Sequence, residues 1–150
     1  MINLFCNIKE HLEKIYSMIP DFDCKHCHKC CNNIIWFEPE NIQIRDFMKH
    51  NCLNLTHLKN LEFYKKNKCP FLSNLGCIIY PVRPIVCRLQ GNIKELQCDL
   101  NKNNKFINLK KFNKIRKDFI ILLDKTNGLD HFYSSRNINM EYFYENDSGK

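Results

Sequence analysis

The nine residues from Asp23 to Cys31, DCKHCHKCC, contain four cysteines and two histidines. Thiolates and imidazoles at this density are typical of metal ligands, since both bind zinc and thiolates also bind iron. The same cysteines could instead form disulfides or provide one catalytic nucleophile. The rest of the chain therefore decides which of these three interpretations applies.

The surroundings of this run favour metal binding over disulfides. All ten cysteines lie within the first 98 residues of a 150-residue chain, which is long enough to bury a core as one domain without covalent cross-links. The first 22 residues lack the basic region of a signal peptide, and no apolar stretch approaches about 18 residues. We therefore expect a cytoplasmic protein, and in that reducing compartment cysteine clusters indicate metal sites or catalysis.

A single catalytic cysteine explains the pattern less simply than a metal site does. Nucleophilic catalysis needs one thiolate and an activating histidine, whereas the run from Cys24 to Cys31 contains four regularly spaced thiols. Two cysteines separated by two residues can converge on one ion through a tight turn. We therefore interpret the run as one half of a metal-binding site.

The other half is predicted further along the chain. Adjacent side chains diverge by about 100° in a helix and point to opposite faces of a strand. Cys30 and Cys31 therefore fit different ions, or one fits an ion and the other the core. The remaining ligands are expected among four cysteines that follow at intervals of eight to eleven residues, each beside a turn signal: Cys69, Cys77, Cys87 and Cys98.

Eight thiolates allow two arrangements of metal. They complete two closed tetrahedral zinc sites, or they hold one iron–sulfur cluster and one zinc ion. The second arrangement follows from Cys24, Cys27 and Cys30 together with the remote Cys69-Pro70. In ferredoxins a [4Fe-4S] cluster is bound by C-x2-C-x2-C and a cysteine before proline. Zinc or iron is therefore the expected cofactor.

The combination of CKHCHKCC, CPFL and GCIIYPVRPIVCR closely resembles the YkgJ-like family of CxxCxxCC zinc- or iron-chelating domains. The resemblance implies eight chelating cysteines, of which seven fall directly on the motifs: Cys24, Cys27, Cys30, Cys31, Cys69, Cys77 and Cys87. Cys98 is the expected eighth. Members commonly have glycine straight after the second cysteine, where this chain has His28.

The same resemblance suggests an alternative function. The bacterial flagellin lysine methylases are similar in their cysteine domain. That similarity implies an iron–sulfur-dependent enzyme, or enzyme component, that assists methyl transfer. The chain leaves little room for a separate substrate domain, so we rank this alternative second.

Two arginines flank Cys87 in the segment YPVRPIVCR. The guanidinium groups of Arg83 and Arg88 can donate hydrogen bonds to thiolate sulfur and offset its charge. Two zinc ions bound by eight thiolates would carry a net charge of about −4. That excess favours placing both arginines beside the cofactor.

The remaining cysteines and the two histidines of the run receive structural interpretations. Cys6 lies beside an apolar helical stripe and Cys52 follows a helix end, so we expect both to be small buried hydrophobic residues. With eight thiols available as ligands, His26 and His28 are expected to face the solvent.

Hydrophobic periodicity predicts the elements around the site. Apolar residues at three- and four-residue spacing predict helices, and short β-prone runs bounded by turn residues predict strands and hairpins. The predicted elements are helices at about 3–18, 38–50, 55–66 and 108–125, a β-prone run at 34–37, a hairpin between 69 and 80, and a helical turn at about 84–89.

The formal net charge of +7 permits anionic partners without selecting one. A chain crowded with Asn, Lys and Ile, and without alanine, gains lysine through composition alone. The basic stretch from Lys110 to Lys117 is therefore expected to be a solvated helix face. The expected partners are metal ions; a protein partner is left open, and neither nucleic acid nor a membrane is expected.

These features predict a small, helix-dominated α+β domain with irregular cysteine-rich metal-binding loops. The single domain spans 1–127, with its motif region at 24–98, and 128–150 forms a C-terminal extension that is partly disordered at its end. The expected function is metal chelation through about eight thiolates. The metal would be largely structural and would tie together loops too irregular to fold alone.

Overall fold

The computed structural model describes residues 2–32, 34–53, 69–73, 76–102, 105–128 and 130–134. For residues 2–5 it describes the backbone alone. The helices are α1 (Ile2–Ser17), α2 (Glu38–His50), α4 (Ile85–Leu89) and α5 (Leu109–Lys125), with 3-10 helices η1 (Tyr80–Val82) and η2 (Lys94–Leu96). The strands are β1 (Ile35–Phe37), β2 (Leu72–Ser73), β3 (Gly76–Cys77) and β4 (Phe132–Ser134). This small mixed α/β domain, dominated by helices, confirms the predicted class.

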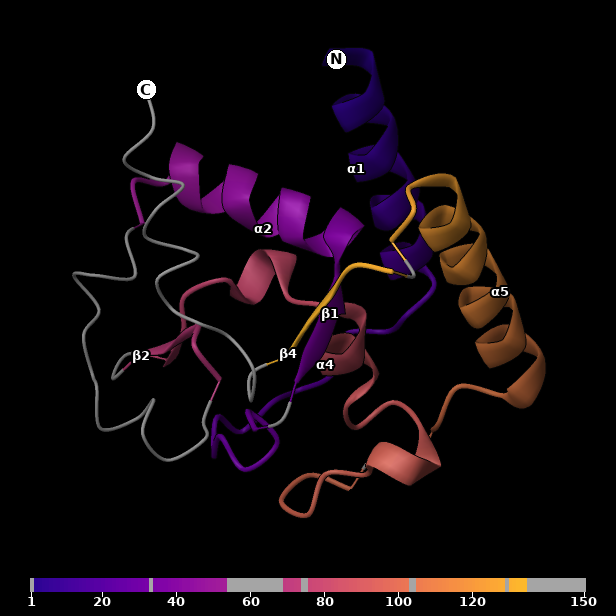
Figure 1. Ribbon diagram of the computed structural model, residues 1–150. Coiled ribbons are helices and arrows are strands. Elements are labelled where there is room, and N and C mark those ends of the chain that lie inside the picture. Colours follow the sequence, from indigo (N-terminus) through magenta and orange to yellow (C-terminus); the bar gives the residue numbers. More distant parts are fainter. Residues whose placement is uncertain are drawn as a thin grey trace.

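Helices α1 and α5 pack side by side (Figure 1) and form the helical core. Their apolar stripes face each other, so that Leu12 and Ile15 of α1 are buried with Ile115 and Phe119 of α5. Helix α5 begins after Asn108, whose side-chain oxygen accepts a hydrogen bond from the backbone amide of Lys111 at 2.8 Å. Both predicted helices are thus confirmed.

A second core forms around Trp36 of β1, and we refer to it as the tryptophan core. The Trp36 side chain is fully buried and meets the ring of Phe71 edge-on, with ring centroids 5.2 Å apart. Its indole nitrogen donates a hydrogen bond of 3.1 Å to the side-chain oxygen of Asn41. Helix α2 follows β1 directly, with Pro39 in its first turn, as the sequence predicts.

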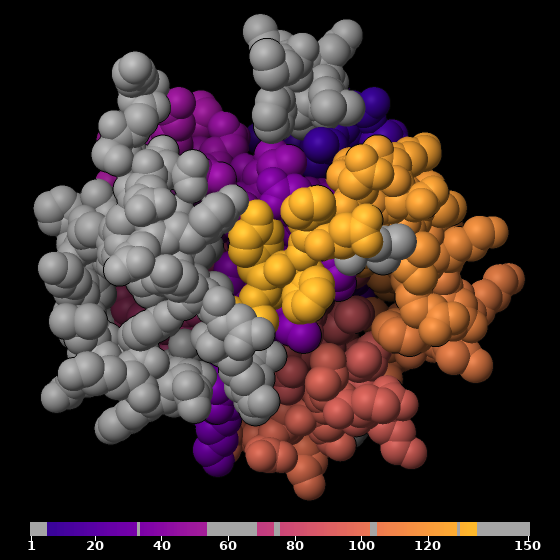
Figure 2. Space-filling model, viewed as in Figure 1, coloured from indigo at the N-terminus to yellow at the C-terminus, as the bar shows by residue number. Residues whose placement is uncertain are grey.

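Strand β4 is a feature that the sequence analysis missed. It pairs antiparallel with β1, Trp36 opposite Tyr133, and these two rings stack with centroids 5.8 Å apart. Figure 2 shows residues 130–134, in yellow, lying across this face of the molecule beside α5. Residues 132–134 fall in the segment assigned to the C-terminal extension, yet they pack on the folded domain. Three residues are too few to show a strand period.

The elements that surround the cysteines are short. Strands β2 and β3 form the predicted hairpin, and α4 is the predicted helical turn. Residues 20–31 contain neither helix nor strand, so the cysteine run forms an irregular loop. The helix predicted at 55–66 lies outside the described residues. Among the helices that are described, none combines the length and apolar character needed to cross a bilayer.

Candidate metal centre

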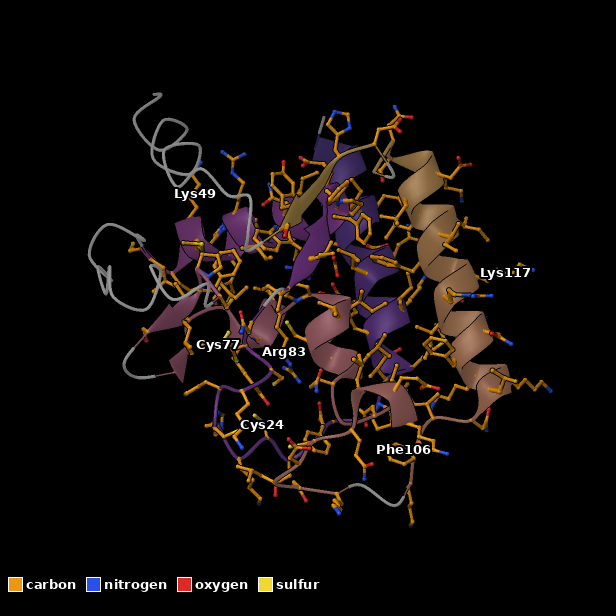
Figure 3. All side chains as sticks on the ribbon, turned by 60° about the horizontal axis from the view of Figure 1, so that its bottom comes forward. Cys24, Lys49, Cys77, Arg83, Phe106 and Lys117 are labelled. Carbon is orange, nitrogen blue, oxygen red and sulfur yellow. The ribbon has the colours of Figure 1, made fainter. Side chains whose placement is uncertain are left out.

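One cavity of about 220 Å³ collects the thiols that the sequence singles out. It lies between the 20–31 loop, the β2–β3 hairpin and α4. All eight predicted ligands line it: Cys24, Cys27, Cys30, Cys31, Cys69, Cys77, Cys87 and Cys98. Figure 3 shows Cys24, Cys77 and Arg83 in the same part of the molecule, away from Lys117 on α5. Four separate segments therefore supply sulfur to one space.

The loop that carries the first four cysteines is tied to distant parts of the chain. The backbone amide of Cys69 donates to the carbonyl oxygen of Cys31 at 3.0 Å, which joins the loop to the hairpin. The side-chain nitrogen of Asn92 donates to the carbonyl oxygen of Pro20, and that of Asn101 to the carbonyl oxygen of Asp23, both at 2.8 Å. These bonds hold an irregular segment against the cavity wall.

Two residues of the loop have left-handed backbones. His26 has a φ of 52° and His28 a φ of 61°, in the region that glycine adopts most readily. The family resemblance leads us to expect glycine at position 28, and this chain has a glycine-like conformation there with a histidine. The backbone amide of His26 donates a hydrogen bond of 3.3 Å to the Cys24 sulfur.

The two histidine side chains differ in their surroundings. His26 is exposed, as predicted. His28 is partly buried, and its Nδ1 lies 3.8 Å from the sulfur of Cys31, so the prediction that it faces solvent is wrong. The left-handed turn at His28 places its ring beside Cys31. Both histidines line the cavity.

The vicinal thiols of Cys30 and Cys31 interact directly. A hydrogen bond from Cys31 to the sulfur of Cys30 lowers the pKa of Cys30 to about 6. The same hydrogen bond, with burial and the nearby sulfurs of Cys30, Cys69 and Cys87, raises the pKa of Cys31. The two thiols therefore titrate as a coupled pair, and their hydrogen bond favours the state in which they share one proton.

Burial dominates the protonation of the other inner thiols. It raises the pKa of Cys69 to about 12, and it also raises the pKa of Cys77 and of Cys87. The charge of a neighbouring sulfur raises each of these pKa values further. Cys77 raises that of Cys69, Cys24 that of Cys77, and Cys69 and Cys77 that of Cys87. Clustered thiols of this kind ionise readily only when a positive ion enters among them.

The sulfurs share a cavity without already forming a coordination sphere. Across the described residues, no three His, Cys, Asp or Glu side chains stand close enough together to hold a metal ion. A bound ion would have to draw the thiols inward. The donor set of eight thiols fits zinc or iron, both of which take sulfur ligands.

The two arginines predicted beside the cofactor occupy different places. Arg83 lines the cavity, with its guanidinium carbon 4.0 Å above the ring of Tyr80, and its charge opposes the burial that raises the pKa of Cys77. Arg88 does not line this cavity. Its Nε donates to the carbonyl oxygen of Arg83 at 2.9 Å and its Nη2 to that of Pro81 at 2.8 Å.

The cysteines predicted as core residues are in fact exposed, so that prediction is wrong. Cys6 lies on the solvent side of α1, one position off the buried stripe. Cys52 follows α2 in a left-handed conformation, with a φ of 51°, which turns it away from the core. Neither lines the cavity. All ten cysteines belong to the described part of the chain, and each is a free thiol.

Glu40 is a structural residue that sequence reasoning missed. It lies in the first turn of α2, and its side chain is fully buried. One carboxylate oxygen accepts from the Tyr16 hydroxyl at 2.8 Å and from the Ile85 amide at 2.6 Å; the other accepts from the Phe37 amide at 3.1 Å. Glu40 thereby fixes the first residue of α4, the helix that carries Cys87.

Comparison with known families agrees with this site. The profile described as "CxxCxxCC: Putative zinc- or iron-chelating domain" matches residues 23–118. No curated protein and no solved structure matches the chain. The matched segment begins at the cysteine loop, contains all eight cavity cysteines and ends within α5. The chain therefore belongs to the CxxCxxCC family of zinc- or iron-chelating domains.

Proposed function

We propose that this protein binds zinc or iron through the thiolates of the eight cavity cysteines, and that the metal is largely structural. The observation that carries the proposal is the convergence of these eight thiols, from four segments, on one cavity of about 220 Å³. Cys6 and Cys52, the two cysteines that are not among the expected ligands, are both outside the cavity.

A bound metal would add covalent links between segments that have little regular secondary structure. The 20–31 loop has no regular secondary structure, and the strands of the hairpin are two residues long. Metal–thiolate bonds between the loop, the hairpin and α4 would supply folding free energy that such short elements lack. The bonds would also relieve the repulsion among clustered sulfurs, because each divalent ion compensates two thiolate charges.

The ligand order allows two forms of the cofactor. Two zinc ions would each take four thiolates in a closed tetrahedron. Alternatively, Cys24, Cys27, Cys30 and Cys69 would hold a [4Fe-4S] cluster, which leaves Cys31 for a second site. The adjacency of Cys30 and Cys31 supports two sites in either case, since one ion seldom takes both neighbours. An iron–sulfur cluster would absorb broadly near ~400 nm, whereas zinc is colourless.

The test compares cysteines inside and outside the cavity. Serine replacements of Cys24, Cys27, Cys69 and Cys87 are purified anaerobically beside the wild type, and metal per chain is measured by elemental analysis. We expect each variant to lose metal and to unfold at a lower urea concentration. Because the wild-type thiols must stay reduced, the proposal includes a reducing, cytoplasmic setting.

The matched controls are Cys6→Ser and Cys52→Ser. Both residues are exposed cysteines of the same chain, so serine there changes the thiol count by the same amount without touching the cavity. Metal content and stability should stay at the wild-type level. Equal losses of metal from both groups of variants would contradict the assignment of the eight ligands.

A further inference from the structure

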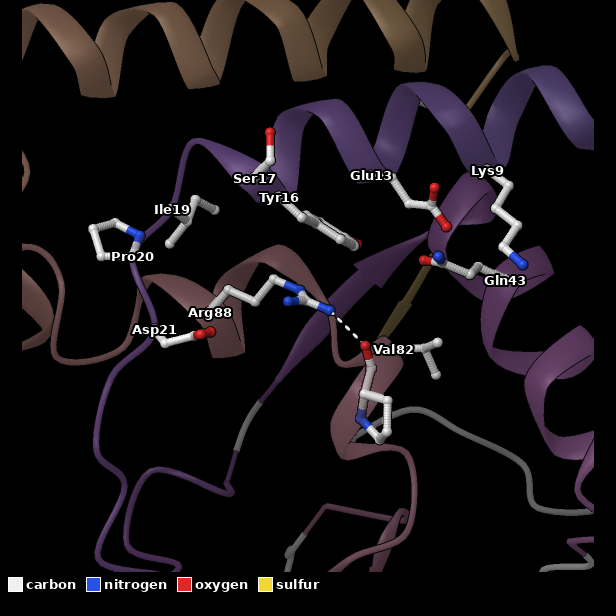
Figure 4. Close-up of a pocket in the computed structure, with 11 residues that line it drawn as sticks. Lys9, Glu13, Tyr16, Ser17, Ile19, Pro20, Asp21, Gln43, Val82 and Arg88 are labelled. Carbon is white, nitrogen blue, oxygen red and sulfur yellow. Dashed lines mark hydrogen bonds between the residues drawn. The ribbon is translucent and has the colours of Figure 1, made fainter.

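A second pocket lies on the other side of the wall that carries the cysteines. Its volume is about 590 Å³, within the range of small-molecule sites, roughly 300–1,000 Å³. We call it the arginine pocket, after Arg88. Residues adjacent in sequence face the two spaces: Tyr80 and Cys87 line the cysteine cavity, whereas Pro81 and Arg88 line the arginine pocket (Figure 4).

The guanidinium of Arg88 is held in one position. It donates to the carbonyl oxygens of Arg83 and Pro81, and its central carbon lies 4.0 Å above the ring of Tyr16. Tyr16 is itself fixed by its hydrogen bond of 2.8 Å to the buried carboxylate of Glu40. A guanidinium has five N–H donors, and two are used among the described residues. The planar fork matches the two oxygens of a carboxylate.

Gln43 adds a second unsatisfied group to the pocket. Its side chain is only 9% exposed, and its buried Oε1 has no hydrogen-bond partner among the described residues. Figure 4 shows the amide of Gln43 pointing into the space that it shares with Glu13 and Arg88. A buried acceptor left without a donor destabilises the fold. A ligand with an N–H group would supply that donor.

The charges that line the pocket exclude simple ions. Lys9 and Arg88 are cationic, whereas Glu13 and Asp21 are anionic, so a lone anion would meet two carboxylates and a lone cation two cations. A molecule that carries both charges a few bonds apart can satisfy both kinds of group. Ile19, Pro20 and Val82 add an apolar wall.

We propose that the arginine pocket binds a free α-amino acid with an apolar side chain. Its carboxylate accepts hydrogen bonds from Arg88, and its ammonium group faces the oxygens of Gln43 and Glu13. The apolar side chain lies against Val82, on the same side of Arg88 as Gln43 (Figure 4). Because α4 and η1 contribute to both spaces, the pocket shares its wall with the cysteine cavity while using none of its thiols.

The test uses the full-length protein as purified and isothermal titration calorimetry with three probes. L-leucine carries both charges, L-leucine amide only the positive charge, and N-acetyl-L-leucine only the negative charge. We expect L-leucine to bind at least about tenfold more tightly than either derivative, because each derivative lacks one charge-assisted contact. Equal binding of the three probes, or no binding of L-leucine up to about 10 mM, would overturn the proposal.

Variants of exposed residues keep the test independent of folding. Glu13→Gln should weaken L-leucine binding, while Lys117→Gln, on the outer side of α5 (Figure 3), should leave it unchanged. Arg88→Lys retains the charge but not the planar fork, so the affinity for the carboxylate should fall about tenfold or more. Circular dichroism confirms that each variant is folded. If Lys117→Gln weakens binding as much as Glu13→Gln, the site lies elsewhere.

Discussion

The backbone amide of Cys69 donates a hydrogen bond of 3.0 Å to the carbonyl oxygen of Cys31. This bond joins the last cysteine of the loop to the first cysteine of the hairpin segment. Cys69 is 8% exposed and also belongs to the tryptophan core, against which Cys31, Cys77 and Cys87 pack. The cysteine cavity and the tryptophan core are therefore one continuous packing unit, and changes in one should be measurable in the other.

Gly91 tests how tightly the cysteine loop is packed. It has a φ of 81°, and a Cβ there would lie 2.6 Å from ring atoms of Phe22, which lines the cavity. Gly91→Ala should lower the free energy of unfolding by about 2–4 kcal/mol, through backbone strain and overpacking. It should also displace Phe22 and reduce metal binding. Urea denaturation and elemental analysis measure the two effects.

Gly76→Ala is the control for this substitution. Gly76 also has a left-handed backbone, with a φ of 111°, but a Cβ there meets nothing within 4 Å. The variant should lose only the strain contribution, about 1–2 kcal/mol. Equal destabilisation by the two alanines would mean that contact with Phe22 contributes nothing.

The protein should be less stable with His28 than with glycine at this position. With a φ of 61°, a side chain there costs about 1–2 kcal/mol, which exceeds the entropy that glycine adds to the unfolded chain. We expect His28→Gly to raise the free energy of unfolding by about 0.5–1 kcal/mol. Lys29, an exposed neighbour without a positive φ, provides the control. Lys29→Gly should be destabilising, and the idea fails if both glycines destabilise equally.

Tyr16 should make stability depend on pH in the alkaline range. Burial and the carboxylate of Glu40 raise its pKa well above the ordinary value of 10.0. Above pH 10.0 the unfolded chain therefore loses the Tyr16 proton while the folded chain retains it, and the free energy of unfolding falls. Tyr16→Phe removes this contribution.

At neutral pH the same variant should be less stable than the wild type by about 1.5–3 kcal/mol, because the Glu40 carboxylate loses a donor. The difference between the two proteins should shrink above the ordinary tyrosine pKa. Urea denaturation at neutral pH and at pH values above 10.0 measures this change. A difference that stays constant or widens would contradict the raised pKa of Tyr16.

Tyr133 tests whether β4 belongs to the folded domain. Its ring stacks on Trp36 at an interplanar angle of 14°, and its hydroxyl donates to the carboxylate of Glu38. Tyr133→Ala should lower the free energy of unfolding by about 2–3 kcal/mol. Phe132, on the same strand, is 58% exposed. Phe132→Ala should therefore change the free energy of unfolding by about 0.5 kcal/mol or less. Equal, small effects would show that β4 contributes little.

The helices could be predicted from the sequence because their signals are local. The apolar stripes of α1 and α5 repeat over several turns, and Asn108 and Pro39 mark helix starts. The cavity cysteines could also be predicted, since the family motifs select seven of them, and Cys98 is the cysteine that follows these motifs in the chain.

What could not be predicted depends on contacts between distant segments. The burial of Glu40 requires Tyr16 and Ile85, which lie far away in the chain. The short strand β4 is recognisable only through its pairing with β1. Arg83 and Arg88 are equivalent in sequence, but the turn from η1 into α4 sends them to different spaces.

The central claim is that the cavity thiolates bind zinc or iron. Elemental analysis and X-ray absorption spectroscopy at the metal edge, on anaerobically purified protein, test it most directly. We predict zinc or iron in stoichiometric amount with a first shell of sulfur, at about 2.3 Å for zinc. A first shell of oxygen or nitrogen alone, or the absence of either metal in stoichiometric amount, would contradict the account.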